Sequence, residues 1–147
     1  MAQPKRYVSK QLGKLLVERG VINPEQLQEA LKIQGQTGGL IGNILVARGY
    51  SSEEAIAQAL TTQYGFPYLP LNNYEIDGPV IRLVPEYVAK QYCLIPVDRI
   101  GSSLTIAVAD PLNVEAIEDI EFMTRLKVQV FISTASQIKE AITRYYG

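Results

Sequence analysis

A repeated segment in the first half of the chain constrains its fold more than any other feature. When the sequence is compared with itself at an offset of 29 residues, segment 12–34 aligns with segment 41–63, and nine of the 23 aligned positions are identical. Chance matching at average residue frequencies gives roughly one or two identities. The first half therefore holds two copies of one small structural unit.

The first copy has the pattern of two short helices around a glycine. Apolar residues starting at Leu12 recur at helical spacing as far as Arg19, and Gly20 follows where a left-handed C-terminal cap is expected. Asn23 and Pro24 then provide an N-cap and a proline at the first helical position. We therefore predict a helix, a glycine turn and a second helix that ends near Gln34.

The second copy follows the same order of signals. It predicts a helix over 41–48, a turn at Gly49, and a second helix that is capped by Ser51 or Ser52. The glycine-rich segment 35–39 lies between the copies and is interpreted as a turn.

The second half changes to a mixed pattern of helices and strands. Prolines punctuate segment 65–71, which predicts an extended entry, and a polar loop follows it over 72–78. The predicted order after the loop is helices over 79–83 and 85–91, strands over 94–100 and 104–109, a helix over 114–124, a strand over 128–132, and a last helix that reaches Tyr146. The predicted fold class is α+β, with tandem two-helix repeats over 1–66 and a small α+β sandwich with a three-stranded sheet over 67–147.

The residue inventory excludes several classes of enzyme. The chain has no histidine, so Ser-His-Asp triads, Cys-His pairs and HExxH zinc sites are impossible. No lysine is followed by serine or threonine, so a P-loop is absent as well. We expect no catalysis and no metal site in this segment, which indicates a binding or coupling module.

Charge and hydropathy exclude further functions. Fourteen basic and fifteen acidic residues give a net charge of −1, without the basic excess typical of nucleic-acid binders. The apolar runs are too short to span a bilayer, and we expect no secretory signal, direct membrane insertion or nucleic-acid partner. The single cysteine, Cys93, has apolar neighbours and is predicted to be a buried, inert thiol in a reducing cytosol.

Three kinds of residue remain as candidates for ligand contacts. Gly13 and Gly42 could let backbone amides approach a phosphate, or they could serve close helix packing. Gln34 and Gln63 could read a base edge with their amides, or they could cap the following turn. Asp110 could accept a guanine N–H, although an aspartate between a strand and a helix is more often an N-cap.

The repeat also carries a family resemblance. The pattern Leu-Gly-x-x-Leu-Val-x-x-Gly-Val-Ile, continued by spaced leucines to Gln34 and followed by a second copy, resembles the N-terminal domain of type II secretion and type IV pilus assembly ATPases, the GspE N-terminal or MshEN domain. Further matching motifs are Gln-Tyr-Gly-Phe-Pro-Tyr from Gln63, Leu-Val-Pro from Leu83, Ile-Pro-Val from Ile95, Ala-Val-Ala-Asp-Pro from Ala107, and Ile-Thr-Arg-Tyr-Tyr from Ile142.

The resemblance implies a cytoplasmic accessory domain that lies ahead of a downstream ATPase domain. It implies coupling of the motor to the cytoplasmic domain of an inner-membrane platform protein, and a location peripheral to the inner membrane through such partners. Some family members bind cyclic di-GMP through the repeats, with an arginine at the start of each. Here Gln11 and Leu40 occupy those positions. Without the two guanidinium groups, we expect no cofactor in this chain and weak or absent cyclic di-GMP binding.

The alternative function is a cyclic di-GMP sensor that uses the tandem repeats. The positions that the resemblance assigns to such a ligand are Gln11, Leu12, Gly13, Leu16, Val17, Gly20, Leu31, Gln34, Ile41, Gly42, Leu45, Val46, Gly49, Gln63 and Asp110.

Overall fold

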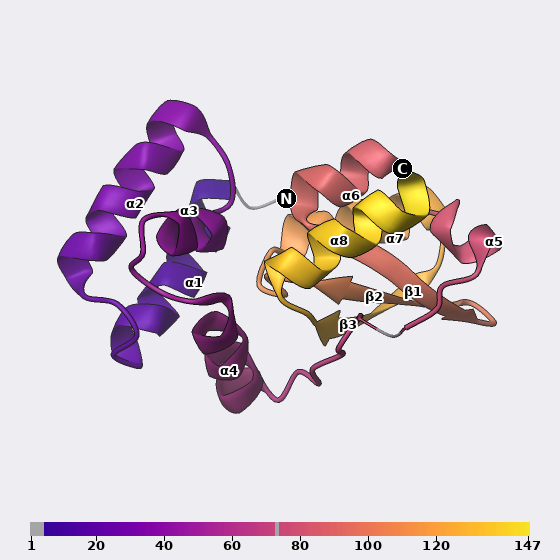
Figure 1. Cartoon of the computed structure of the whole chain (residues 1–147), viewed down its shortest axis with the longest axis horizontal. Coiled ribbons are helices and arrows are strands. Elements are labelled where there is room, and N and C mark those ends of the chain that lie inside the picture. Colours follow the sequence, from indigo (N-terminus) through magenta and orange to yellow (C-terminus); the bar gives the residue numbers. More distant parts are fainter. Residues whose placement is uncertain (1–4, 73) are drawn as a thin grey trace.

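The computed structural model describes residues 5–72 and 74–147, with side chains from residue 12 onward. Within these residues the chain forms eight helices and three strands, and the predicted α+β class is confirmed. Figure 1 shows two halves side by side, with the first four helices in one half and the remaining helices and all strands in the other.

The helical half contains both copies of the repeat. Its elements are α1 (Lys5–Glu18), α2 (Pro24–Thr37), α3 (Ile41–Ala47) and α4 (Glu53–Tyr64). The cap signals act as predicted, because Asn23 and Gln26 form a complete capping box and the Ser52 hydroxyl accepts a hydrogen bond from the Ala55 amide. Gly20 and Gly49 both have a left-handed φ, near 74° and 77°.

The predicted turn over 35–39 is too long. Helix α2 continues through Thr37, and the chain leaves the helix only at Gly38 and Gly39, which have φ values of 75° and 98°. Gly35 stays helical because one glycine costs a helix only about 1 kcal/mol. The Thr37 hydroxyl also donates to the Ile33 carbonyl.

The second half is a sheet of three strands with helices packed on it. Its elements are α5 (Gly78–Ile81), α6 (Glu86–Tyr92), β1 (Leu94–Ile100), β2 (Ser103–Val108), α7 (Val114–Thr124), β3 (Lys127–Ile132) and α8 (Ala135–Tyr146). The strand order is β1-β2-β3, with β1 antiparallel and β3 parallel to β2. Helices α6 and α8 pack on the sheet, as Figure 1 shows.

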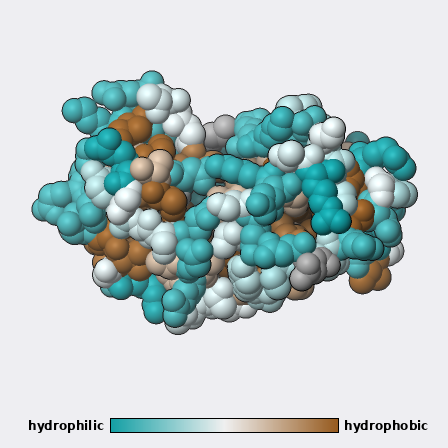
Figure 2. All heavy atoms as spheres, viewed as in Figure 1, coloured by the Kyte–Doolittle hydropathy of each residue, from teal (hydrophilic) through white to brown (hydrophobic). Residues whose placement is uncertain are grey.

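Two hydrophobic clusters form the core. One lies among the four helices of the repeat, and the other lies between the sheet and the helices of the sandwich. Ile132 at the end of β3 is fully buried in the helical cluster although its strand belongs to the sandwich. On the face drawn in Figure 2, hydrophobic residues reach the surface only in scattered groups.

The extended segment after α4 joins the halves through backbone hydrogen bonds. The Leu69 amide donates to the Ile132 carbonyl and the Ile132 amide donates to the Pro67 carbonyl, both at 2.8 Å. The Ser133 hydroxyl donates to the Leu69 carbonyl at 2.6 Å. The predicted extended entry is therefore a short parallel partner of β3, formed at Tyr68.

Glycine has a different structural role in each copy of the repeat. In α1, a Cβ on Gly13 would clash with the Leu27 side chain of α2, whereas a Cβ on Gly42 would lie 3.8 Å from Ile56 Cδ1, an ordinary contact. The pairs are equivalent in the repeat, since Leu27 corresponds to Ile56. The packing of α1 against α2 is therefore the tighter of the two.

We predict different effects for the two matched alanine substitutions. Gly13→Ala should be less stable than Gly42→Ala by about 1 kcal/mol, because the end of the Leu27 side chain must shift to make room and this cost offsets the gain in helix propensity. Gly42→Ala should be neutral or stabilising by up to about 1 kcal/mol. Urea unfolding of both variants tests this difference, and equal free energies for the two variants would contradict it.

Candidate functional site

A pocket between the two halves gathers several of the predicted ligand positions. Its cavity has a volume of about 30 Å³, which is room for one or two water molecules and is far below the roughly 300–1,000 Å³ of small-molecule sites. The helical half contributes α1, α3 and α4 to its walls, and the sandwich contributes the segments that follow β2 and β3. The predicted residues that line this pocket are Leu12, Gly42, Val46 and Asp110.

Asp110 is the predicted site residue whose electrostatics is most altered by the fold. Its carboxylate accepts a hydrogen bond from the Leu112 amide at 3.0 Å, which closes a turn ahead of α7. The interpretation as an N-cap is wrong, because the Asn113 side chain caps α7 by accepting from the Ala116 amide. Desolvation raises the pKa of Asp110 to about 6 from an ordinary value of 3.8.

Glu53 of α4 lies on another wall of the pocket and connects the halves directly. Its carboxylate accepts hydrogen bonds from the Ser136 amide at 2.6 Å and from the Ser136 hydroxyl at 2.7 Å. Ser136 lies in the first turn of α8, and Glu53 itself begins α4. The carboxylate therefore meets the positive ends of two helix dipoles, which is a favourable place for a negative charge.

The other predicted positions have structural roles in the helical half. Gln34 donates from Nε2 to the Gly39 carbonyl at 2.9 Å, which is the turn-capping role, and Gln63 accepts from Arg19 at 3.4 Å. Gly13 lies within α1 against Leu27, away from the helix start. Gln11 belongs to α1, but its side chain lies outside the described residues. The remaining predicted positions are buried core residues (Leu16, Ile41, Leu45), partly buried packing residues (Val17, Leu31) and turn glycines (Gly20, Gly49).

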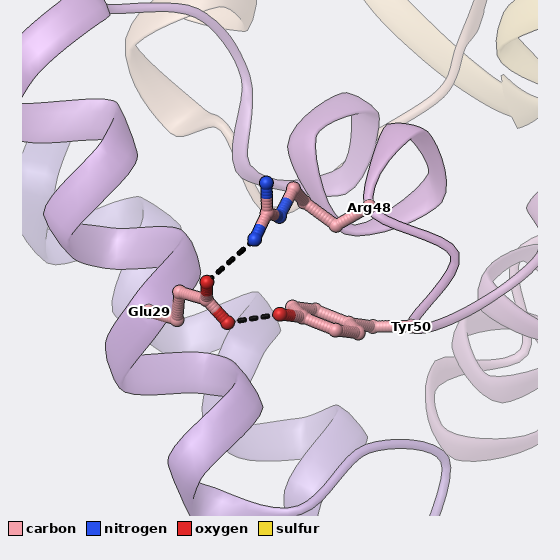
Figure 3. Close-up of polar contacts among 3 residues, drawn as sticks. All are labelled: Glu29, Arg48 and Tyr50. Carbon is pink, nitrogen blue, oxygen red and sulfur yellow. Dashed lines mark hydrogen bonds and ion pairs between the residues drawn. The ribbon is translucent and has the colours of Figure 1, made fainter.

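A polar cluster that the sequence analysis missed joins α2 to the turn between α3 and α4. Figure 3 shows the carboxylate of Glu29 between the side chains of Arg48 and Tyr50. Arg48 forms an ion pair with Glu29 at 2.6 Å, and the Tyr50 hydroxyl donates to the other carboxylate oxygen. The Tyr50 hydrogen bond, followed by the charge of Arg48, holds the pKa of Glu29 below its ordinary value of 4.5.

The repeat contained a signal for this cluster. Arg19 and Arg48 occupy equivalent positions in the two copies. Each arginine reaches the second helix of the other copy, where Arg48 meets Glu29 and Arg19 meets Gln63. The two copies are therefore linked by two reciprocal side-chain contacts, each made by the arginine at the same position of the repeat.

The other candidates of the sequence analysis are internal contacts. Cys93 is buried, and desolvation raises the pKa of its thiol to about 11, so it is a poor nucleophile. Within the described residues no three carboxylates or cysteines form a metal-binding group, and no helix is both long and apolar enough to cross a bilayer.

Comparisons with known proteins give one consistent result. The MshEN domain family matches residues 64–147. The type IV pilus assembly ATPase PilB of Myxococcus xanthus is 37% identical over 140 residues, which are 95% of this chain and 25% of that protein. PilB of Thermus thermophilus is 34% identical over 139 residues, 93% of this chain and 16% of that protein. The chain thus spans a quarter or less of the length of these relatives.

Two solved structures resemble the whole fold. A structure of MshE with cdg, cyclic di-GMP, has a TM-score of 0.67 and 31% identity, and the match covers 92% of this chain and 98% of that one. The N-terminal domain of XpsE has a TM-score of 0.74 and 23% identity over 100% of both chains, which shows a shared fold.

The raised pKa of Asp110 predicts that stability depends on pH in an unusual direction for a carboxylate. Because the folded state holds the proton more tightly than the unfolded state, the free energy of unfolding should fall as the pH rises from about 4 to about 6. Asp110→Asn keeps the acceptor for the Leu112 amide but cannot ionise. The variant should therefore be more stable than the wild type at pH 7.5, by less than about 3 kcal/mol, and equally stable near pH 4.

Urea unfolding at both pH values checks this prediction. Glu118→Gln, which replaces an exposed carboxylate on α7, is the matched control. A stabilisation of the Asp110→Asn variant that is the same at both pH values would contradict the proposed cause, since it could not come from the carboxylate charge.

Proposed function

The chain belongs to the MshEN domain family, and from this membership we propose that it is the non-catalytic N-terminal domain of a type II secretion or type IV pilus assembly ATPase. One observation carries the proposal: 95% of this chain aligns with a pilus assembly ATPase, yet it spans only 25% of that protein. The chain thus corresponds to one module of a larger motor protein, and nucleotide hydrolysis belongs to the ATPase domain that follows it.

We propose that the module couples the motor to the cytoplasmic domain of an inner-membrane platform protein. The balanced charge of the chain favours a protein partner over a nucleic acid. In this role the domain is cytoplasmic and is held at the inner membrane through its partner.

The proposal divides the chain into a helical repeat subdomain over 1–66 and an α+β subdomain over 67–147. The two separate hydrophobic clusters support this division. The extended segment that starts at Gly65 lies between the two subdomains and pairs with β3.

A second candidate function is cyclic di-GMP binding by the repeats. The 31% identity with MshE, whose structure contains this nucleotide, favours it. The residues at the two positions where the family has arginines argue against it. Gln11 and Leu40 carry no charge, and Leu40 packs against the core of the sandwich. Gln34 is also engaged with the turn at Gly39. We therefore propose that cyclic di-GMP binding by this chain is weak or absent.

The coupling function is tested by co-purification. We expect the tagged chain to retain the cytoplasmic domain of the platform protein encoded beside its parent gene, in equal amounts, and to hydrolyse no ATP alone. An irrelevant protein that carries the same tag is the control. Failure to retain the platform domain would contradict the coupling function, and ATP hydrolysis by the chain alone would contradict the non-catalytic assignment.

The nucleotide prediction is tested by thermal unfolding and calorimetry. With about 100 μM cyclic di-GMP, a hundredfold above a Kd of 1 μM, a binding protein gains ~2.7 kcal/mol of stability. We expect no such shift for the wild type, and a Kd below about 1 μM would overturn this expectation. In that case Gln34→Ala should abolish binding.

Matched variants separate the role of the arginines from that of general charge. Gln11→Arg combined with Leu40→Arg should introduce binding, whereas the corresponding lysine pair should not, because lysine lacks the planar guanidinium that stacks on a guanine. Gln11→Arg alone keeps the packing of Leu40 and controls for loss of stability. Equal binding by the arginine and lysine pairs would refute the guanidinium explanation.

A further inference from the structure

The outward surface of α7 carries three large apolar side chains that are exposed to solvent. Phe122 is 80% exposed, Val114 is 43% exposed and Met123 is 40% exposed. The other two phenylalanines, Phe66 and Phe131, are partly buried. Exposed apolar residues that are grouped on one element mark interaction surfaces more often than isolated ones do.

These residues are grouped by the geometry of the helix. Val114, Glu118 and Phe122 are spaced by four residues and follow one stripe, while Asp119 and Met123 follow the adjacent stripe. Val114 and Phe122 are eight residues apart, or about 12 Å along the axis. Residues that face the core, such as Ala116 and Ile120, are buried on the opposite side. We call the five outward residues the α7 face.

The α7 face is acidic as well as apolar. Helix α7 contains Glu115, Glu118, Asp119 and Glu121 and no lysine or arginine. Two of these carboxylates have partners, since Asp119 accepts from the Tyr92 hydroxyl at 2.6 Å and Glu121 accepts from the Val128 amide at 3.0 Å. Glu118 is exposed one turn before Phe122, and Arg125 at the end of α7 places its guanidinium 5.9 Å from the centre of the Phe122 ring. The four carboxylates of α7 outnumber this one cation. A partner that covers the apolar stripe must therefore approach a negative charge.

The charge of the α7 face selects among the possible occupants. An anionic lipid surface would be repelled by the carboxylates. A second copy of this chain, related by a two-fold axis, would bring the same carboxylates close together, which is also unfavourable. An amphipathic helix with lysine or arginine beside its apolar stripe complements both features, and packing along one helix suits a span of about three turns.

We propose that the α7 face is a docking surface for a cationic amphipathic helix of the platform protein's cytoplasmic domain. The inference rests on the proposed coupling function and assigns it to a particular surface. Phe122 is the apolar anchor of this contact, and Glu118 supplies the charge that orients the partner helix.

Calorimetric titration of the chain with the cytoplasmic domain of the platform protein tests the proposal. Phe122→Ala should weaken binding about thirtyfold or more, as expected for a central aromatic anchor. Glu118→Lys should weaken it about tenfold, and the wild-type Kd should rise with salt concentration. Tyr87→Ala is the matched control, because this aromatic side chain is 68% exposed on α6, and it should leave the Kd unchanged.

Other outcomes separate this proposal from the coupling function. If the platform domain binds Phe122→Ala and the wild type equally well, coupling stands and the α7 face is not its docking surface. If the wild type binds no platform domain, both are overturned. Loss of self-association, or of binding to phosphatidylglycerol-containing vesicles, on Phe122→Ala substitution would assign the α7 face to a second copy or to lipid and would overturn the proposal. Thermal unfolding of each variant verifies that it is folded.

Discussion

The pairing of the extended segment at Tyr68 with the end of β3 is the contact on which the arrangement of the two halves depends. Ile132 contributes to both sides of this junction, because its backbone binds Pro67 and Leu69 while its side chain is buried among the repeat helices. Glu53 adds a second link through Ser136 at the start of α8. A short strand pairing and one carboxylate thus fix where the repeat lies against the sandwich, and the pocket that contains Asp110 is a result of this placement.

Much of the fold follows from local signals in the sequence. The predicted bounds of β1 and α7 agree with the structure, because each element is delimited by residues that act locally, such as Gly101 after β1 and Asn113 before α7. The internal repeat predicted the helical half for the same reason, since both copies carry their own caps. The turn predicted over 35–39 is too long, because a glycine weakens a helix without necessarily ending it. The end of α2 is set by the backbone conformation at Gly38.

The candidate site could be predicted only in part. The family pattern identified Leu12, Gly42, Val46 and Asp110, which the structure brings to one pocket. The residues of the Glu29–Arg48 ion pair are 19 positions apart in the sequence, and those of the Glu53–Ser136 hydrogen bond are 83 apart. A short sequence motif therefore could not predict either contact. The exposure of Phe122 was equally hidden, because a phenylalanine in an amphipathic helix is normally interpreted as a core residue.

The proposed role of this domain is binding rather than catalysis. Gln11 and Leu40, which stand where the family resemblance places arginines, are uncharged, and Leu40 packs against the core of the sandwich. The surface of α7 remains available to a partner. The most direct test is the ATPase rate of the parent motor protein with and without residues 1–147, measured with the platform domain present and absent. Loss of the platform-dependent change in rate, with the basal rate retained, is the predicted result. A platform-dependent change that survives deletion would contradict the coupling role of this domain.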